Sequence, residues 1–144
     1  MKTFKEFTVP SRILNSEEVN NYGKKLNIKY YKPHCMLDEL VGKAKSRESG
    51  VVNLDKSSGP GTHYVCYYKN GNTRIFYDSF GLTPPIEIQK YLGENVLYQT
   101  FRLQKLNEVN CGKHCLYMLK MLSDGYKFTD IVLSLLKEFG GELV

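Results

Sequence analysis

Residues 104–115, QKLNEVNCGKHC, bring a polar amide, a turn and a cysteine to the start of a segment with helical periodicity. Apolar residues recur at three-residue steps after Cys111, at Leu116, Leu119 and Leu122, so an amphipathic helix is predicted to begin near Cys111. In the first turn of a helix, free backbone N–H groups and the positive end of the helix dipole stabilise a thiolate, which is the reactive form of cysteine. Asn110 is a favoured N-cap residue just before it. Cys111 is therefore a candidate nucleophile, with a small buried residue at a helix start as the alternative.

Size and composition predict a single globular domain over residues 1–144, large enough to bury a core without disulfides or metal. The net charge is +5, 42% of the residues are apolar, and tryptophan is absent. No segment approaches the roughly 18 to 20 continuous apolar residues of a membrane span, and MKTFKEFTVP lacks the apolar core of a signal peptide. The four cysteines lack the dense spacing of a secreted disulfide framework, so we expect reduced thiols. From the lack of a long apolar segment we expect no membrane partner.

The N-terminal third is predicted to hold one helix and little other regular structure. Asn15 followed by Glu18 is a capping-box signature, which predicts a helix to about Leu26. Residues 27–49 are polar and interrupted by proline and glycine, so we expect irregular structure there or a short helix over residues 37–41. Residues 51–54 have the pattern of a short buried strand, and the loop KSSGPGT follows it.

The clearest β signal is the pair of runs HYVCYYK and TRIFYD, at residues 63–69 and 73–78. They are joined by Asn70-Gly71-Asn72, and Asn-Gly is the preferred sequence of a type I′ hairpin turn. The two runs are therefore predicted to be antiparallel neighbours.

The second half is predicted to alternate helix and strand, because proline suits the first turn of a helix and glycine its end. The expected elements are a helix from Pro84-Pro85 to about Leu92, a strand over residues 96–101, a helix from Cys111 to Gly125, and a helix over FTDIVLSLLKEF that ends at Gly140-Gly141.

The hairpin offers Cys111 a base and an acid. His63 opens the first run and Asp78 closes the second, and the first and last residues of a tight hairpin lie side by side. A neutral imidazole can take the thiol proton, and a carboxylate on its other nitrogen fixes the tautomer and stabilises the imidazolium. Gln104 precedes Cys111 closely enough to form an oxyanion hole with the Cys111 backbone N–H, a device worth roughly 3 kcal/mol per donor. The predicted catalytic residues are His63, Asp78, Gln104 and Cys111.

Each role has a rival in the sequence. Asp55 is a second carboxylate, but it does not share the predicted hairpin with His63. His114 is a second base, but a cation near a helix N-terminus is disfavoured by the dipole. Cys115 lies on the same helical face as Cys111 but deeper, where burial raises the pKa of a thiol.

The segments GTHYVCYY, IFYDSFG with its following PP, the Gln104-x6-Cys111 spacing and CGKHCLYML together resemble the adenain-like cysteine proteases, which are related to the SUMO proteases. The resemblance covers about residues 51–122. VVNLD and NSEEVNNYGKKLNI also look like the polinton and virophage branch, so the chain resembles a virophage maturation protease similar to that of mavirus. Carried over by position, His63 matches the family's base, Asp78 its acid, Gln104 its oxyanion donor and Cys111 its nucleophile. Tyr64 stands where the family usually has tryptophan.

The resemblance implies an α+β fold, a papain-like or adenain-like cysteine protease with a mixed central sheet flanked by helices. It also implies peptide-bond hydrolysis through a thioester, with viral capsid and structural precursor proteins as substrates, in the virion and the infected host cell. The family favours glycine near the scissile bond, so the Gly140-Gly141 pair is a candidate self-cleavage site, with a helix cap as the alternative. We expect no cofactor; DNA or a peptide is expected as an activator, because the adenovirus relative responds to both.

Three other functions remain open. An isopeptidase acting on ubiquitin-like proteins, or an acyltransferase, would use the same site. A zinc module would use Cys111, His114 and Cys115, with His34 or Cys35 as a further donor, but paired metal-binding knuckles are missing. A basic virion protein would bind nucleic acid; the charge permits weak non-specific DNA binding, but the basic residues are scattered and carry no recognition motif.

Overall fold

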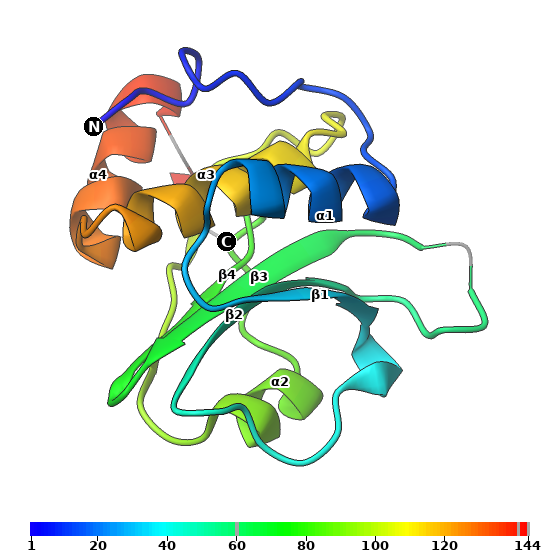
Figure 1. Cartoon of the computed structure of the whole chain (residues 1–144). Coiled ribbons are helices and arrows are strands. Elements are labelled where there is room, and N and C mark those ends of the chain that lie inside the picture. Colours follow the sequence, from blue (N-terminus) through cyan, green and yellow to red (C-terminus); the bar gives the residue numbers. More distant parts are fainter. Residues whose placement is uncertain (60, 141, 144) are drawn as a thin grey trace.

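The computed structural model describes residues 1–59, 61–140 and 142–143 and builds them around a mixed sheet of five strands (Figure 1). The sheet has the order β1-β2-β3-β4-β5, with both edge pairs parallel and the central pairs antiparallel. Its strands are β1 (Tyr31–Met36), β2 (Arg47–Asn53), β3 (Tyr64–Asn70), β4 (Thr73–Tyr77) and β5 (Val96–Leu97).

Helices cover both faces of this sheet. Helices α1 (Ser16–Lys25) and α3 (Cys111–Ser123) lie on one face, with α4 (Phe128–Phe139) beside α3, and α2 (Ile86–Leu92) lies on the other face (Figure 1). Because side chains of a strand alternate between faces, β3 sends Cys66 and Tyr68 toward α3 and sends Val65 and Tyr67 toward α2. Both sets are buried, so the central hairpin carries two cores and gives the α3 helix a fixed platform.

The predicted N-terminal helix is confirmed. The Asn15 side chain accepts from the Glu18 backbone N–H at 2.8 Å, and the Glu18 carboxylate accepts from the Asn15 N–H at 3.1 Å, which completes the capping box. Ahead of the helix, residues 1–14 run over α3 and bury several apolar side chains: Phe4, Phe7, Val9 and Leu14.

The expectation of irregular structure over residues 27–49 is wrong in two places. Residues 31–36 form the edge strand β1, and β2 begins at Arg47 instead of Val51. Proline is tolerated at an edge, and the β1–β2 register shifts between Lys32 and Cys35, around Pro33. This strand was not predicted because its residues neither alternate between polar and apolar nor include a run of β-branched side chains. The short helix is a 3₁₀ turn, η1 (Leu37–Glu39).

The predicted hairpin is confirmed, but its turn is of another type. Asn70 pairs with Thr73, so the two-residue loop is Gly71-Asn72. Gly71 alone of these two has a positive φ, 62°. A type I′ turn needs positive φ at both loop residues, whereas glycine at the first is typical of type II′.

The predicted strand over residues 96–101 is divided. Val96 and Leu97 pair with β4 as β5, and β6 (Phe101–Arg102) leaves the sheet to pair with β7 (Glu142–Leu143). The three helices predicted for the second half are confirmed as α2, α3 and α4. Gly125 follows α3 with φ 96°, and Gly140 caps α4 in the left-handed conformation. Gly141 lies outside the described residues. Within those residues we find no helix with the length and apolarity required to cross a membrane.

Candidate active site

The ends of the hairpin and the start of α3 meet at one point of the fold. His63 immediately precedes β3 and Asp78 immediately follows β4. Their side chains meet at 2.7 Å, from His63 Nε2 to Asp78 Oδ1. The sequence predicted that His63 and Asp78 would lie directly opposite each other. In the observed register Cys66 lies opposite Tyr77, so His63 and Asp78 approach diagonally, beyond the paired strands. The structure nevertheless brings His63 and Asp78 together as predicted.

The loop after β4 holds this pair in place. The Phe80 backbone N–H donates to Asp78 Oδ1 at 2.8 Å, and the Phe80 ring stacks on the His63 ring with centroids 4.5 Å apart. Gln99 donates through Nε2 to the Asp78 carbonyl at 2.5 Å. Asp78 is almost fully buried, so these contacts fix a carboxylate that solvent does not reach. Gln99 carried no signal in the sequence, because its role exists only through tertiary packing.

His63 and Cys111 are electrostatically coupled. Burial lowers the pKa of His63, but hydrogen bonds with Asp78 and Cys111 outweigh that effect and raise the pKa to about 9. Burial raises the pKa of the Cys111 thiol, but the His63 hydrogen bond and the backbone N–H groups of Tyr64 and Gly112 bring it below its usual value. With Nε2 on Asp78, the other ring nitrogen, Nδ1, is left for the sulfur. The arrangement therefore shifts the pair toward a thiolate and an imidazolium.

Cys111 occupies the position in α3 that the sequence predicted, but Asn110 does not cap it as expected. Cys111 is the first residue of the helix and Asn110 is the N-cap, yet the Asn110 side chain makes no capping hydrogen bond. Its backbone has ψ 27°, whereas a capping side chain reaches the helix from extended backbone. The first-turn N–H of Gly112 is left to the Cys111 sulfur instead.

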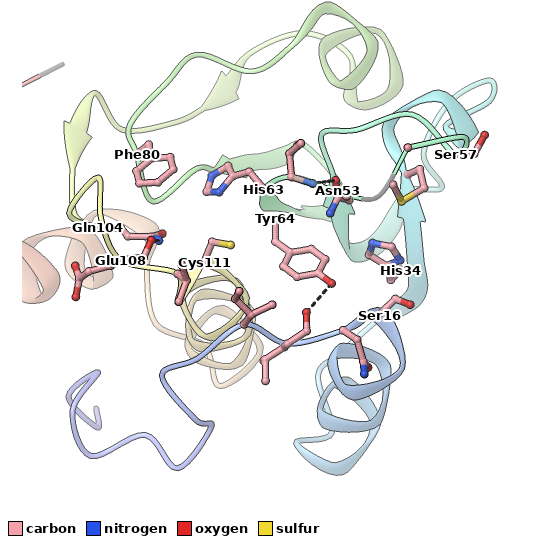
Figure 2. Close-up of a pocket in the computed structure, with 18 of the residues that line it drawn as sticks. Ser16, His34, Asn53, Ser57, His63, Tyr64, Phe80, Gln104, Glu108 and Cys111 are labelled. Carbon is pink, nitrogen blue, oxygen red and sulfur yellow. Dashed lines mark hydrogen bonds between the residues drawn. The ribbon is translucent and has the colours of Figure 1, made fainter.

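Gln104 lies at the same site with its amide orientation fixed. The Ser79 hydroxyl donates to Gln104 Oε1 at 2.6 Å, and both side chains are buried. One N–H of Gln104 Nε2 donates to the Glu108 carbonyl at 2.8 Å, which leaves the second N–H of the amide for another acceptor. Figure 2 shows the Gln104 amide beside Cys111. Ser79 adjoins Asp78 in the sequence, but nothing in the sequence indicated its contact with Gln104.

Cys111, His63 and Gln104 line an open cleft of about 650 Å³. Figure 2 shows the cleft between the start of α1, the loop before β3 and the loop that leads to α3. Cys111, His63 and Gln104 lie toward one end, and His34, Asn53 and Ser57 toward the other. The cleft therefore has room for an extended chain across the sulfur.

The rival residues have other partners. The Asp55 carboxylate accepts from the backbone N–H groups of Lys56 at 2.8 Å and Gly61 at 3.0 Å, and so organises the loop. His114 is buried, bonded to the Tyr77 hydroxyl at 2.9 Å, and burial lowers its pKa to about 3.

Cys115 is buried, and burial raises the pKa of its thiol well above the usual value, so it is a poor rival nucleophile. Within residues 1–59, 61–140 and 142–143, no three histidine, cysteine or acidic side chains gather to hold a metal ion. The zinc alternative thus lacks a donor set in this part of the chain.

Comparison with known proteins gives a likeness in fold. No protein-family model matches the sequence, and no curated protein sequence matches it. The crystal structure of selenomethionine ASFV pS273R protease superposes with a TM-score of 0.61 at 14% sequence identity, covering 94% of this chain and 69% of that one. The α+β fold expected from the sequence, with a mixed central sheet flanked by helices as in a viral protease, is confirmed. The likeness does not single out the polinton and virophage branch.

Proposed function

We propose that this chain is a cysteine endopeptidase that cleaves viral capsid and structural precursor proteins during virion maturation. One observation carries the proposal: His63 bonds Asp78 at 2.7 Å through one ring nitrogen and pairs with Cys111, inside an open cleft. The fold likeness to a viral protease supports the same reading.

The proposed reaction has two halves, the acylation of Cys111 and the hydrolysis of the resulting thioester. The Cys111 thiolate attacks the scissile carbonyl carbon and forms a tetrahedral oxyanion, which the Cys111 backbone N–H and the Gln104 amide stabilise. The His63 imidazolium then protonates the departing amine, and the carbon–nitrogen bond breaks to leave a thioester on Cys111. In the second half neutral His63 takes a proton from water, the hydroxide adds to the thioester, and the thiolate leaves. Asp78 holds the imidazole tautomer throughout.

The shape of the cleft fits an extended main chain. Gly59 and Gly61 form part of its wall, which leaves room at the backbone of the loop before His63. We propose small residues beside the scissile bond, including Gly-Gly, as the resemblance implies. We place the activity in the virion and infected cell, without a cofactor, and with DNA or a viral peptide as the activator.

Hydrolysis by purified protein tests the proposal. Precursors of the structural proteins and fluorogenic Gly-Gly peptides should be cleaved by the natural chain and not by Cys111→Ala. Cys35→Ser is the matched control, because Cys35 is half-buried on β1 and packs toward the α2 core; it should retain activity. Cleavage of isopeptide-linked ubiquitin-like conjugates, with linear precursors left intact, would replace the proposal by the isopeptidase alternative. Retained hydrolysis in Cys111→Ala would refute the nucleophile.

A further inference from the structure

The end of the cleft away from Cys111, where His34, Asn53 and Ser57 lie, is here called the cleft arm. It contains a buried side-chain amide whose N–H donor is unused. Asn53 is the last residue of β2, and the residue is 6% exposed. Its Oδ1 accepts from the backbone N–H groups of Asp55 at 2.9 Å and Thr62 at 3.0 Å. Two donors converging on one amide atom identify that atom as the oxygen, so the amide cannot be flipped. The position of its nitrogen is thus fixed as well.

That nitrogen faces the cleft. Asn53 lines the cleft, and Figure 2 shows its amide above Tyr64 and His34, with the nitrogen directed into the space. Among the described residues Asn53 Nδ2 has no hydrogen-bond partner, and it is not among the polar atoms sealed from solvent. A donor that solvent reaches on a cleft wall can exchange water for a ligand oxygen, so this N–H has the form of a ligand contact.

Glycine at position 61 keeps this donor open. Gly61 has φ +93°, and a Cβ there would lie 3.0 Å from Asn53 Nδ2. A side chain at position 61 would therefore press on the amide nitrogen as well as strain the backbone.

The surroundings select a neutral acceptor. Tyr64 presents its ring in this arm while its hydroxyl donates to the Leu14 carbonyl at 2.8 Å, and the His34 ring packs edge-on against it at 5.5 Å between centroids. Glu108 is the one carboxylate among the described lining residues, which include no lysine or arginine, and it lies at the Gln104 end. An amide N–H beside aromatic surface suits the carbonyl oxygen of an extended peptide.

We propose that Asn53 is a substrate-binding residue, whose Nδ2 donates to a main-chain carbonyl of the peptide bound beyond His63. The inference rests on the proposed peptidase function for its ligand class. Asn53 makes this contact before and during the reaction, so it contributes to binding and not to the chemical step.

Binding to an inactive protein tests the contact without relying on turnover. The probe is a short fluorescein-labelled peptide centred on Gly-Gly, titrated into Cys111→Ala with and without Asn53→Asp. Aspartate keeps the acceptors for Asp55 and Thr62 but removes the donor. Loss of one hydrogen bond should weaken peptide binding about tenfold. Asn72→Asp, on the exposed hairpin turn, adds the same charge far from the cleft and should bind the peptide normally.

Two further readouts separate this inference from the proposed function. Iodoacetamide is too small to use the cleft arm, so Asn53→Asp with Cys111 intact should be alkylated at the natural rate while its KM for the peptide rises. A thioamide accepts hydrogen bonds more weakly than an amide does. A peptide with a thioamide in place of the carbonyl that contacts Asn53 should bind Cys111→Ala more weakly than the parent peptide, whereas the two peptides should bind alike once Asn53→Asp is also present. Equal peptide affinity with and without Asn53→Asp, or no peptide binding, would overturn the role of Asn53. Failure of the natural chain to hydrolyse a peptide that it binds would instead overturn the proposed function.

Discussion

Replacing Asp78 by asparagine should alter stability in a manner set by the titration of His63. Asparagine keeps an acceptor for the Phe80 N–H and for the imidazole, but removes the charge that helps raise the pKa of His63 to about 9. In the unfolded chain that pKa is about 6.5. A proton held more tightly in the folded state stabilises that state wherever the folded chain carries the proton, and most fully where the unfolded chain carries it too.

The size of this effect follows from the two pKa values. Their separation corresponds to about 3 kcal/mol, at about 1.36 kcal/mol for each pH unit. The stabilisation is fully present below about pH 6.5 and is lost as pH rises through about 9. The His63 side chain is 13% exposed, so solvent screening removes little of this contribution.

Urea unfolding of the natural chain and Asp78→Asn, under reducing conditions at about pH 6 and about pH 10, measures the difference. Tyrosine fluorescence can report the transition because the chain has 11 tyrosines and no tryptophan. We expect Asp78→Asn to be less stable by up to about 3 kcal/mol at the lower pH, and the gap to close at the higher one. A gap of the same size at both pH values would refute the coupling of His63 to Asp78.

Other changes test the rest of the site. Cys111 should react with iodoacetamide faster than the other three cysteines at about pH 6, because its pKa is lowered; equal labelling by mass spectrometry would contradict this. Ser79→Ala should leave the buried Gln104 oxygen without its donor, lowering stability by about 1–3 kcal/mol and reducing kcat; unchanged kcat and unfolding would show that Ser79 does not hold the amide. Duplex DNA should stimulate peptide hydrolysis at low salt and lose its effect as salt rises; equal rates in every condition, without a gel shift, would mean constitutive activity. Gly140 already serves as a helix cap, so we expect the tail to remain intact, and a tail lost from active protein but kept in Cys111→Ala would reveal self-processing.

The elements predicted correctly are those whose signals are local. The capping box at Asn15, the leucine spacing after Cys111 and the aromatic hairpin each encode their structure within a few residues. The His63–Asp78 contact was predictable for the same reason, because a short hairpin brings its two ends together even when the register is misjudged.

The elements that escaped prediction depend on distant parts of the chain. Strand β1 is polar, contains Pro33, and becomes a strand because β2 offers it a parallel partner. Strand β6 pairs with β7, roughly 40 residues away, so no local pattern marks where β5 ends. Ordinary polar residues such as Gln99 gain their roles only from the packed fold.

The wrong expectation for Asn110 has a different cause. Residue preference at a cap assumes extended backbone, and the loop that leads to Cys111 instead enters the helix with ψ 27°. The Gln104 side chain holds the loop by donating to the Glu108 carbonyl at 2.8 Å, and Gln104 is itself held by the distant Ser79 hydroxyl, which donates to its Oε1 at 2.6 Å. Local preference therefore located the helix start but not the contacts at that start.

The measurement that tests the central claim most directly is mass mapping of the adduct formed with a Gly-Gly peptidyl vinyl sulfone near neutral pH. A thiolate activated by His63 and reached through the cleft should give one adduct, on Cys111, and none in Cys111→Ala. His63→Ala should slow its formation by about 100-fold or more, the scale of a lost general base. No adduct on the natural chain, adducts spread over several cysteines, or an unchanged rate in His63→Ala would contradict the account.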